Sequence, residues 1–186
     1  MTIPRTVGFV DGENLVMRYQ AMVKGGAKPK ADVVHERDCF VWHNDVTSWS
    51  MFDFIRVNYY TSTTGDLVKV DSLKDKICSV DYTFNYADGA EAANAMLVPN
   101  VFHKPIKNTK ARNVDLQISI DFLRAAHLPN VEVLYLLSGD GDYIPLIQEA
   151  ARYGKEIWVG AFSSGMHTKL KHHIDQFVLL DDLFFE

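Results

Sequence analysis

Cysteine is scarce in this sequence of 186 residues, with only Cys39 and Cys78 present. The two residues lie far apart and neither belongs to a Cys-x-x-Cys pair, so nothing supports a disulfide framework or a zinc ribbon. We expect both thiols to behave as small buried apolar groups in a protein kept in a reducing compartment.

Long apolar runs are also missing. No run approaches the ~20 residues that span a bilayer. The short apolar segment after Arg5 lacks the longer hydrophobic region and the cleavage site of a secretory signal. These absences predict a cytoplasmic protein that does not associate with membranes.

Positive charge is not in excess, because 19 lysine and arginine residues stand against 24 aspartate and glutamate residues, for a net charge of −5. That balance argues against a protein that coats nucleic acid nonspecifically. It permits an enzyme that combines local basic groups with a metal. A Gly-x-Gly-x-x-Gly turn, a P-loop and a serine nucleophile elbow are all absent from the sequence. None of the seven histidines stands in a metal-ligand pattern.

Apolar, β-branched segments alternate with helical segments along the chain. The length and the 47% hydrophobic content fit one globular domain over residues 1–186. The alternation predicts an α/β sheet protein rather than a sandwich or a helical bundle. We expect strands at 6–10, 52–60, 82–86, 96–102, 132–137, 157–162 and 177–180, and helices at 13–23, 66–79, 114–126 and 143–153.

Some segments carry further detail. Pro99 limits the strand at 96–102 to a sheet edge or a break. The helix at 114–126 has Leu116 and the apolar residues four and seven positions later on or near one face. Residues 27–50 are open to several interpretations: a strand, a helix edge or an inserted flap, with apolar side chains that would cover substrate or form a dimer surface.

Acidic residues follow two of the strongest predicted strands. The first strand ends at Asp11, and the strand at 132–137 leads into Ser138 and Asp140, with Asp142 two residues later. In open α/β sheets ligands bind beyond these strand ends, so the two turns would converge if their strands were neighbours. Clustered carboxylates require a cation, and without histidine or cysteine nearby they suit Mg²⁺ or Mn²⁺ better than zinc.

Each of these residues also has a plain structural interpretation. Asp11 and Ser138 are suitable caps for a turn or a helix. Asp115 opens the helix at 114–126, where a carboxylate interacts favourably with the helix dipole whether or not it takes part in chemistry. Asp121 lies in the middle of that helix, as a partner of the site or as a charge that faces solvent.

Three segments combine acidic residues with glycine or asparagine in a recognisable order. They are Phe9-Val10-Asp11-Gly12-Glu13-Asn14-Leu15, then Arg112-Asn113-Val114-Asp115 with Asp121 six residues later, then Leu137-Ser138-Gly139-Asp140-Gly141-Asp142-Tyr143-Ile144-Pro145-Leu146. Together they resemble the motifs of NYN domains, a LabA-like branch of the PIN-like nuclease superfamily, and they frame residues 6–180. Arg112 and Asn113 replace the lysine and glycine that the family usually has there, and neither change removes an expected ligand.

The resemblance implies a three-layer, Rossmann-like (PIN-like) fold with a central, mainly parallel sheet, and a metal-dependent ribonuclease activity. One or two Mg²⁺ or Mn²⁺ ions would activate water for hydrolysis of an RNA phosphodiester bond. When the family's motif residues are matched to this sequence, the resemblance implies a catalytic and metal-binding pocket. It would consist of Asp11, Asp115, Asp140 and Asp142, with Asn14, Ser138 and Asp121 as supporting residues.

A basic segment precedes the helix at 114–126 and would either grip the phosphate backbone, with an affinity that weakens in salt, or form a solvated loop. Aromatic residues are candidates for stacking on bases, although aromatics in strands more often belong to the core. The basic residues are Lys104, Lys107, Lys110 and Arg112, and the aromatic ones are Trp42, Tyr59 and Tyr60.

Two other functions stay open. A haloacid-dehalogenase-like phosphohydrolase would also place an aspartate after the first strand, but Glu13 stands where that family has a second aspartate. A binding module for RNA or protein would keep the fold without turnover. The substrate class (RNA or DNA), the mode of cleavage and a possible homodimer are open as well.

Overall fold

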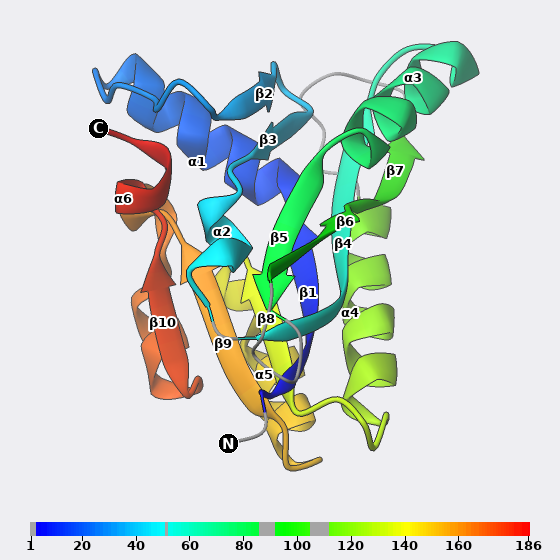
Figure 1. The fold of residues 1–186 in the computed structure, drawn as a ribbon, viewed down its shortest axis with the longest axis vertical. Helices are drawn as coiled ribbons and strands as arrows, with labels where there is room; N and C mark the ends of the chain where they lie inside the picture. The colour runs from blue at the N-terminus through cyan, green and yellow to red at the C-terminus, as the bar shows by residue number, and fades with distance from the viewer. Residues whose placement is uncertain (1–2, 51, 86–91, 105–111) are drawn as a thin grey trace.

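A parallel sheet of six strands forms the centre of the molecule (Figure 1). The computed structural model describes residues 3–50, 52–85, 92–104 and 112–186. Neighbouring strands in the order β10-β9-β8-β1-β4-β7 are parallel throughout, which confirms the predicted α/β, three-layer Rossmann-like (PIN-like) fold. The strands are β1 (Arg5–Asp11), β4 (Asp53–Thr63), β7 (Val98–His103), β8 (Val133–Leu137), β9 (Glu156–Ala161) and β10 (Gln176–Leu179).

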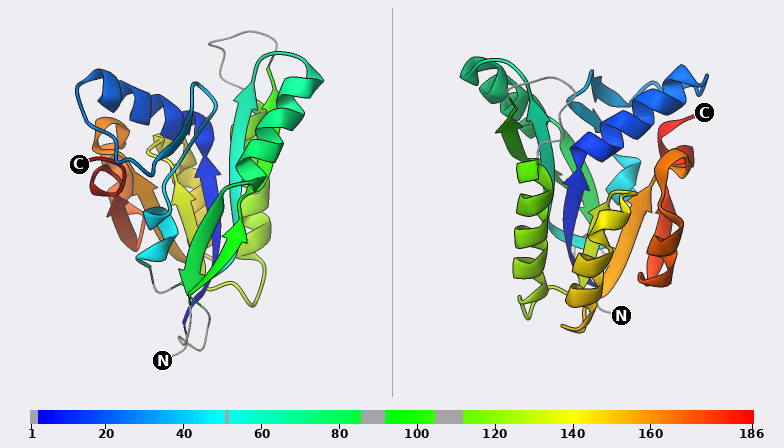
Figure 2. Two further views of the ribbon diagram at one scale, coloured as in Figure 1. Left: turned by 45° about the horizontal axis from the view of Figure 1, so that its top comes forward. Right: turned by 180° about the vertical axis from the view of Figure 1, so that it is seen from behind.

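Both faces of this sheet are covered, so its central strands bury consecutive side chains, as all five residues of β8 do. Helices α4 (Arg112–Ala126) and α5 (Ile144–Ala151) cover one face, which the right-hand view of Figure 2 shows. Helices α1 (Gly12–Lys24) and α3 (Leu67–Cys78) belong to a second apolar cluster with residues of β1, β4 and β8. In the described part of the chain, no helix is both long and apolar enough to cross a membrane.

The helix predicted at 114–126 is present as α4, but its predicted apolar face is the outer one. Leu116 is 60% exposed and Ile120 is 37% exposed, whereas Val114, Ile118 and Phe122 are fully buried. The helix therefore carries two apolar stripes at the same four-residue spacing. The inner stripe includes Phe122, whose ring centre lies 5.0 Å from that of Phe9 in β1.

Residues 27–50 form a small layer against the sheet. Strands β2 (Val34–Glu36) and β3 (Phe40–Trp42) make an antiparallel hairpin, followed by the short helix α2 (Asp45–Ser48). The three residues of β3 are buried inside the chain, so they are not available as a dimer surface. Trp42, Tyr59 and Tyr60 belong to the core, as is more common for aromatics in strands, and with at most 1% exposure they are not available to stack on bases.

Polar contacts fix this hairpin in place. The hydroxyl of Tyr59 accepts from the Val41 amide at 3.1 Å and donates to the Val41 carbonyl at 3.3 Å. At the tip of the hairpin Asp38 adopts a left-handed backbone with φ of 63°. The Gln20 side chain of α1 hydrogen-bonds both the amide and the carboxylate of Asp38. The segment is therefore tied to the sheet through Tyr59 and to α1 through Gln20.

The chain between α3 and α4 differs from the expected pair of strands. A second antiparallel hairpin, β5 (Asp81–Asn85) with β6 (Ala92–Met96), stands beside the main sheet. The predicted strand at 96–102 is divided at Leu97 between β6 and β7, and β7 with Pro99 is an edge strand, as the proline predicts. Cys39 is buried, Cys78 is partly buried, and both are free thiols.

The remaining differences lie near the carboxyl end. The predicted helix at 143–153 begins with a 3-10 turn, Gly141–Tyr143, and its α-helical part ends at Ala151. The chain then turns at Gly154, whose φ is +73°. Two further 3-10 turns, Ser163–Gly165 and Thr168–His172, and the short helix α6 (Asp181–Phe184) were not expected from the sequence.

The Tyr59 hydroxyl gives a test of how the hairpin is held. We expect Tyr59→Phe to lower the free energy of unfolding by about 1–3 kcal/mol, because it leaves a buried amide and a buried carbonyl without their partner. Urea unfolding measures the change. Tyr153→Phe is the matched control, since Tyr153 is 43% exposed and should lose little. Equal stabilities for the two variants would contradict this account of the hairpin.

Candidate active site

The carboxyl ends of β1 and β8 bring the first two acidic turns together. The strands pair in parallel with Val10 opposite Leu137, so Asp11 and Ser138 emerge side by side. The Ser138 hydroxyl donates to Asp11 at 2.9 Å. Asp11 also caps α1 by accepting from the Asn14 amide at 3.1 Å. The neighbourhood of the two strands, on which the predicted convergence depends, is therefore confirmed.

The turn after β8 is tied back to α1. The side-chain carbonyl of Asn14 accepts from the Gly139 amide at 3.2 Å. Within the turn, the Asp140 amide donates to Ser138 Oγ at 3.2 Å and the Asp142 amide donates to Asp140 Oδ1 at 3.0 Å. Asn14 and Ser138 thus fix the position of the Asp140 turn relative to Asp11.

A third carboxylate reaches the same place from α4. Asp115 lies in the first turn of that helix. The Tyr143 hydroxyl lies 3.2 Å from Asp115 Oδ1 and 3.4 Å from Asp11 Oδ2. Burial, followed by the charges of Asp11 and Asp115, raises the pKa of Tyr143 far above its ordinary value. The phenol therefore keeps its proton and donates between the two carboxylates.

Burial also sets the charge state of Asp11. The side chain is only 3% exposed, and burial raises the pKa of Asp11 to about 6. Hydrogen bonds from Asn14 and Ser138 act in the opposite direction, while the nearby charges of Asp115 and Glu13 raise the pKa further. A carboxylate held against its own desolvation and against like charges is stabilised by a cation.

Glycine is required in the acidic turn because the loop after β9 packs directly on it. A Cβ atom on Gly139 would lie 2.6 Å from the Gly165 carbonyl oxygen, and one on Gly141 would lie 2.6 Å from the His167 ring. The His167 amide donates to the Gly139 carbonyl at 2.9 Å. The Ser-Gly-Asp-Gly-Asp spacing therefore allows two backbone segments to touch at the site.

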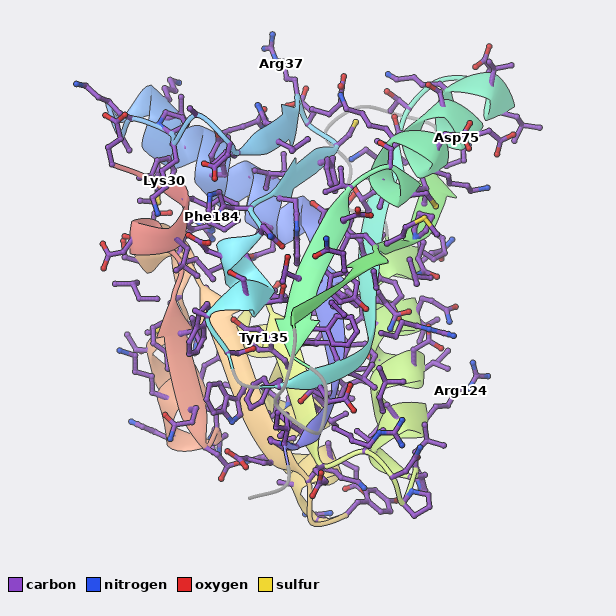
Figure 3. All side chains as sticks on the ribbon, viewed as in Figure 1. Lys30, Arg37, Asp75, Arg124, Tyr135 and Phe184 are labelled. Carbon is purple, nitrogen blue, oxygen red and sulfur yellow. The ribbon has the colours of Figure 1, made fainter. Side chains whose placement is uncertain are left out.

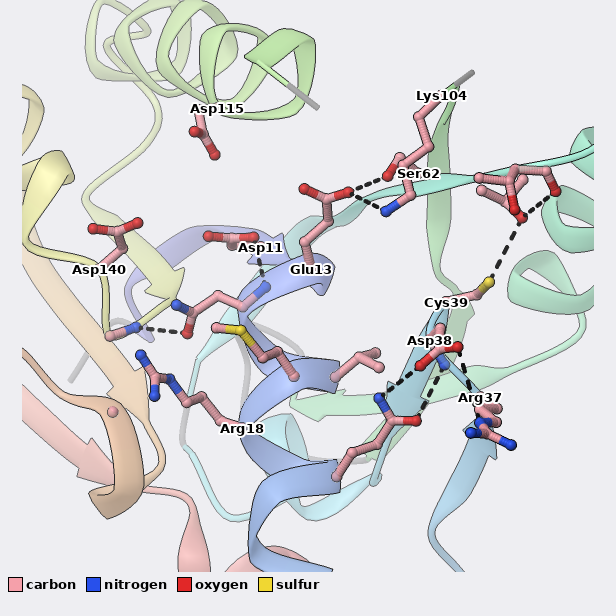
Figure 4. Close-up of a pocket in the computed structure, with 18 of the residues that line it drawn as sticks. Asp11, Glu13, Arg18, Arg37, Asp38, Cys39, Ser62, Lys104, Asp115 and Asp140 are labelled. Carbon is pink, nitrogen blue, oxygen red and sulfur yellow. Dashed lines mark hydrogen bonds and ion pairs between the residues drawn. The ribbon is translucent and has the colours of Figure 1, made fainter. Parts of the chain in front are cut away.

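These turns border a cavity of about 960 Å³ (Figure 4). It extends from the aspartates toward the β2–β3 hairpin and the start of α3. Asp11, Asp115 and Asp140 line it together with Asn14, and its basic residues come from four different elements. Those basic residues are Arg18, Arg37, Lys69 and Lys104.

Three residues predicted for the acidic site do not line the cavity, namely Ser138, Asp121 and Asp142, and Ser138 is buried beneath it against Asp11. Asp142 follows Asp140 in the same turn but does not line the cavity. Asp121 lies further along α4, where its carboxylate accepts from the Tyr60 hydroxyl at 3.0 Å and pairs with Arg124 at 3.2 Å. Arg124 points away from the body of the molecule (Figure 3), so Asp121 links a core tyrosine to the outer surface of α4.

The basic residues predicted to bind nucleic acid do not all lie at the cavity in the described structure. Lys104 lines the cavity and forms an ion pair with Glu13 at 3.2 Å. Glu13 also accepts from the Ser62 hydroxyl. Lys107 and Lys110 lie outside the described residues, and Arg112 begins α4 without a described side chain.

Sequence reasoning missed several residues that line the cavity. Glu13 lies inside the first motif and was not assigned a role in the site. Arg18 stands four residues after Asn14 and therefore on the same face of α1, which is a signal that the sequence contains. Arg37, Lys69 and His167 have no such signal, because the β2–β3 hairpin, the start of α3 and the loop after β9 bring them to the site from distant parts of the chain.

The donor set fits a hard divalent ion. In the described part of the chain, no three histidine, cysteine, aspartate or glutamate side chains come close enough together to form a ready-made metal cluster. Mg²⁺ keeps several of its waters and is commonly bound by only one or two carboxylates. The carboxylates around this open cavity are hard oxygen donors, the kind that such an ion takes.

Comparison with known proteins identifies a family but no characterised relative. A family model described as "NYN domain" matches residues 5–181. No curated protein matches the chain. A crystal structure of a protein of unknown function from Vibrio parahaemolyticus RIMD 2210633 has the same fold, with a TM-score of 0.63 at 19% identity. The similarity covers 100% of this chain and 98% of that one.

The raised pKa of Asp11 predicts how stability depends on pH when no metal is present. The folded state holds the Asp11 proton more tightly than the unfolded chain does. The stabilisation of the folded state that this proton provides is therefore complete below the ordinary pKa of 3.8. It is lost as the pH rises through the folded-state pKa of about 6. We expect the unfolding free energy of the wild type, measured in EDTA, to fall by up to about 3 kcal/mol relative to Asp11→Asn over that range.

Urea unfolding at a series of pH values measures this difference. Asp182→Asn, at an exposed position in α6, is the control and should follow the wild type. A wild-type curve parallel to that of Asp11→Asn would show that Asp11 titrates normally.

Proposed function

Because this chain belongs to the NYN domain family, a nuclease-type family, we propose that it is a metal-dependent ribonuclease that hydrolyses RNA phosphodiester bonds. The observation that carries this proposal is the position of Asp11, Asp115 and Asp140 around one cavity. The three carboxylates come from three separate elements, and hydrogen bonds to neighbouring side chains hold them there. An ordinary helix cap or turn would not need that convergence.

Asp11, Asp115 and Asp140 would hold Mg²⁺ or Mn²⁺. A bound ion of this kind lowers the pKa of a coordinated water and stabilises negative charge on a phosphate. The chain itself supplies the arrangement: Ser138 and Asn14 join the Asp11 and Asp140 turns, and the Tyr143 hydroxyl holds Asp115 close to Asp11. Asp142 supports the turn through its amide.

RNA would enter along the basic residues of the cavity. Carboxylates alone would repel a polyanion, so a substrate-binding cavity needs cations at its walls. The arginine and lysine residues that line it come from α1, the β2–β3 hairpin, α3 and the end of β7. Free thiols at Cys39 and Cys78 fit the reducing cytoplasm that we propose as its location.

The position of Glu13 favours this function over a phosphohydrolase of the haloacid-dehalogenase kind. That mechanism needs an acid that can give up a proton beside the first aspartate. Here the Glu13 carboxylate accepts from Ser62 and pairs with Lys104. Glu13 is therefore engaged by a hydroxyl and an ammonium group, and is not positioned as the second aspartate of that family would be.

Asp140→Asn tests the nuclease proposal. We expect the wild type to cleave labelled single-stranded RNA with Mg²⁺ or Mn²⁺ and to stop in EDTA. The variant should lose more than about 100-fold in rate, since even the outer partners of metal ligands contribute about 10–100-fold. Asp182→Asn should cleave normally. A wild type that cleaves neither RNA nor single-stranded DNA with any metal would refute the proposal and favour a binding module.

Metal binding is testable without any substrate. We expect Mg²⁺ at about 100 times its dissociation constant to stabilise the wild type by about 2.7 kcal/mol near neutral pH. Asp11→Asn should gain much less, because the buried negative charge that the ion neutralises is gone. Thermal unfolding with and without Mg²⁺ measures both values. Equal stabilisation of the two proteins would place the ion elsewhere.

A further inference from the structure

Arg18 of α1 occupies an unusual position in the cavity. In Figure 4 its guanidinium group lies on the same side of the cavity as Asp140. Nη1 donates to the Ser164 carbonyl at 3.2 Å, whereas Nε is buried and has no hydrogen-bond partner among the described residues. Within that part of the chain no carboxylate forms an ion pair with Arg18. Among the described residues, this partly buried cation thus has no ion-pair partner.

The loop after β9 determines where this guanidinium lies. A Cβ atom on Gly165 would lie 2.0 Å from Arg18 Nε and 2.4 Å from Cζ. The guanidinium group therefore rests directly against the backbone of Gly165, in a place that only glycine leaves open.

This loop is itself anchored at both ends. The Ser163 amide donates to Asp181 at 2.8 Å, and the Ser163 hydroxyl donates to the same carboxylate. At the other end the His167 amide donates to Gly139 in the acidic turn. The loop that positions Arg18 is consequently fixed to the turn that carries Asp140.

The other cations of the cavity are placed differently. Lys104 is engaged by Glu13. Arg37 has a side chain that is 85% exposed, lies 3.9 Å from Asp38 and extends outward from the tip of the hairpin (Figure 3). Lys69 is exposed in the first turn of α3. Of the four, Arg18 is the one that lies beside the acidic turn and whose donors form no ion pair with a described carboxylate. A planar guanidinium with several donors matches the oxygens of a phosphate group.

We propose that Arg18 binds a backbone phosphate of the nucleic-acid substrate next to the acidic centre, and that Gly165 positions it. This inference rests on the proposed nuclease function. The phosphate supplies the counter-charge that the described residues do not provide. The positive charge of Arg18 also offsets the repulsion between the polyanion and the carboxylates, so both are compatible within one cavity.

The test measures binding and cleavage separately. Binding of a short fluorescent single-stranded RNA is followed by anisotropy in EDTA over a series of salt concentrations, and cleavage of the same RNA is followed with Mg²⁺. We expect Arg18→Ala to weaken binding about 10-fold and to raise KM by a similar factor. The slope of log affinity against log salt should fall by about one, as for one lost phosphate contact.

Two further variants separate phosphate binding from a structural role. Arg18→Lys keeps the charge, so it should restore the salt slope while recovering only part of the affinity. Gly165→Ala keeps the net charge but displaces the guanidinium, and it should weaken binding as Arg18→Ala does. Arg152→Ala removes an exposed arginine that pairs with Glu149, and its binding should be unchanged. Thermal unfolding should show all four variants folded.

The outcomes distinguish this inference from the proposed function. If the wild type cleaves RNA and Arg18→Ala has the wild-type affinity, salt slope and KM, the inference is wrong and the nuclease proposal stands. If binding depends on Arg18 but nothing is cleaved, the nuclease proposal fails and the phosphate site stands. A wild type that neither binds nor cleaves RNA overturns both.

Discussion

The parallel pairing of β1 with β8 is the constraint on which the candidate site depends. It places Asp11 and Ser138 side by side at the same edge of the sheet, and every later contact builds on that pair. Asn14 can reach Gly139 only because α1 starts where β1 ends beside the turn after β8. If β1 and β8 were separated by another strand, the same residues would serve as two unrelated helix or turn caps.

The site is stabilised against its own electrostatics by the rest of the fold. Asp11 is buried with its pKa raised to about 6, beside the charges of Asp115 and Glu13. Its hydrogen bonds from Asn14 and Ser138 offset only part of that unfavourable burial. The two apolar clusters on either side of the sheet must supply the remainder. Under the proposed function, a bound cation would recover part of this unfavourable free energy.

Local patterns predicted the parts of the site that depend on neighbours in sequence. A buried strand followed by Asp11-Gly12 is recognisable, and so is the turn that carries Asp140, because each feature lies within a few residues of the chain. The sequence also predicted α4 as a helix, but not that Val114 and Phe122 would face the sheet in place of Leu116. Two stripes of equal spacing cannot be told apart before the partner surface is known.

The contact between Arg18 and Gly165 shows why the rest of the site could not be predicted from the sequence. The two residues are far apart in the chain, and nothing near either one indicates the contact. It arises because the loop after β9 packs on Gly139 through a bare backbone and is then close enough to support the arginine. Glycine at 139 and 165 therefore allows the acidic turn, the loop after β9 and Arg18 to pack together. A side chain at Gly165 would meet the Arg18 guanidinium, while the carbonyl of the same residue packs against Gly139, so the basic and acidic residues of the cavity share one stretch of supporting backbone.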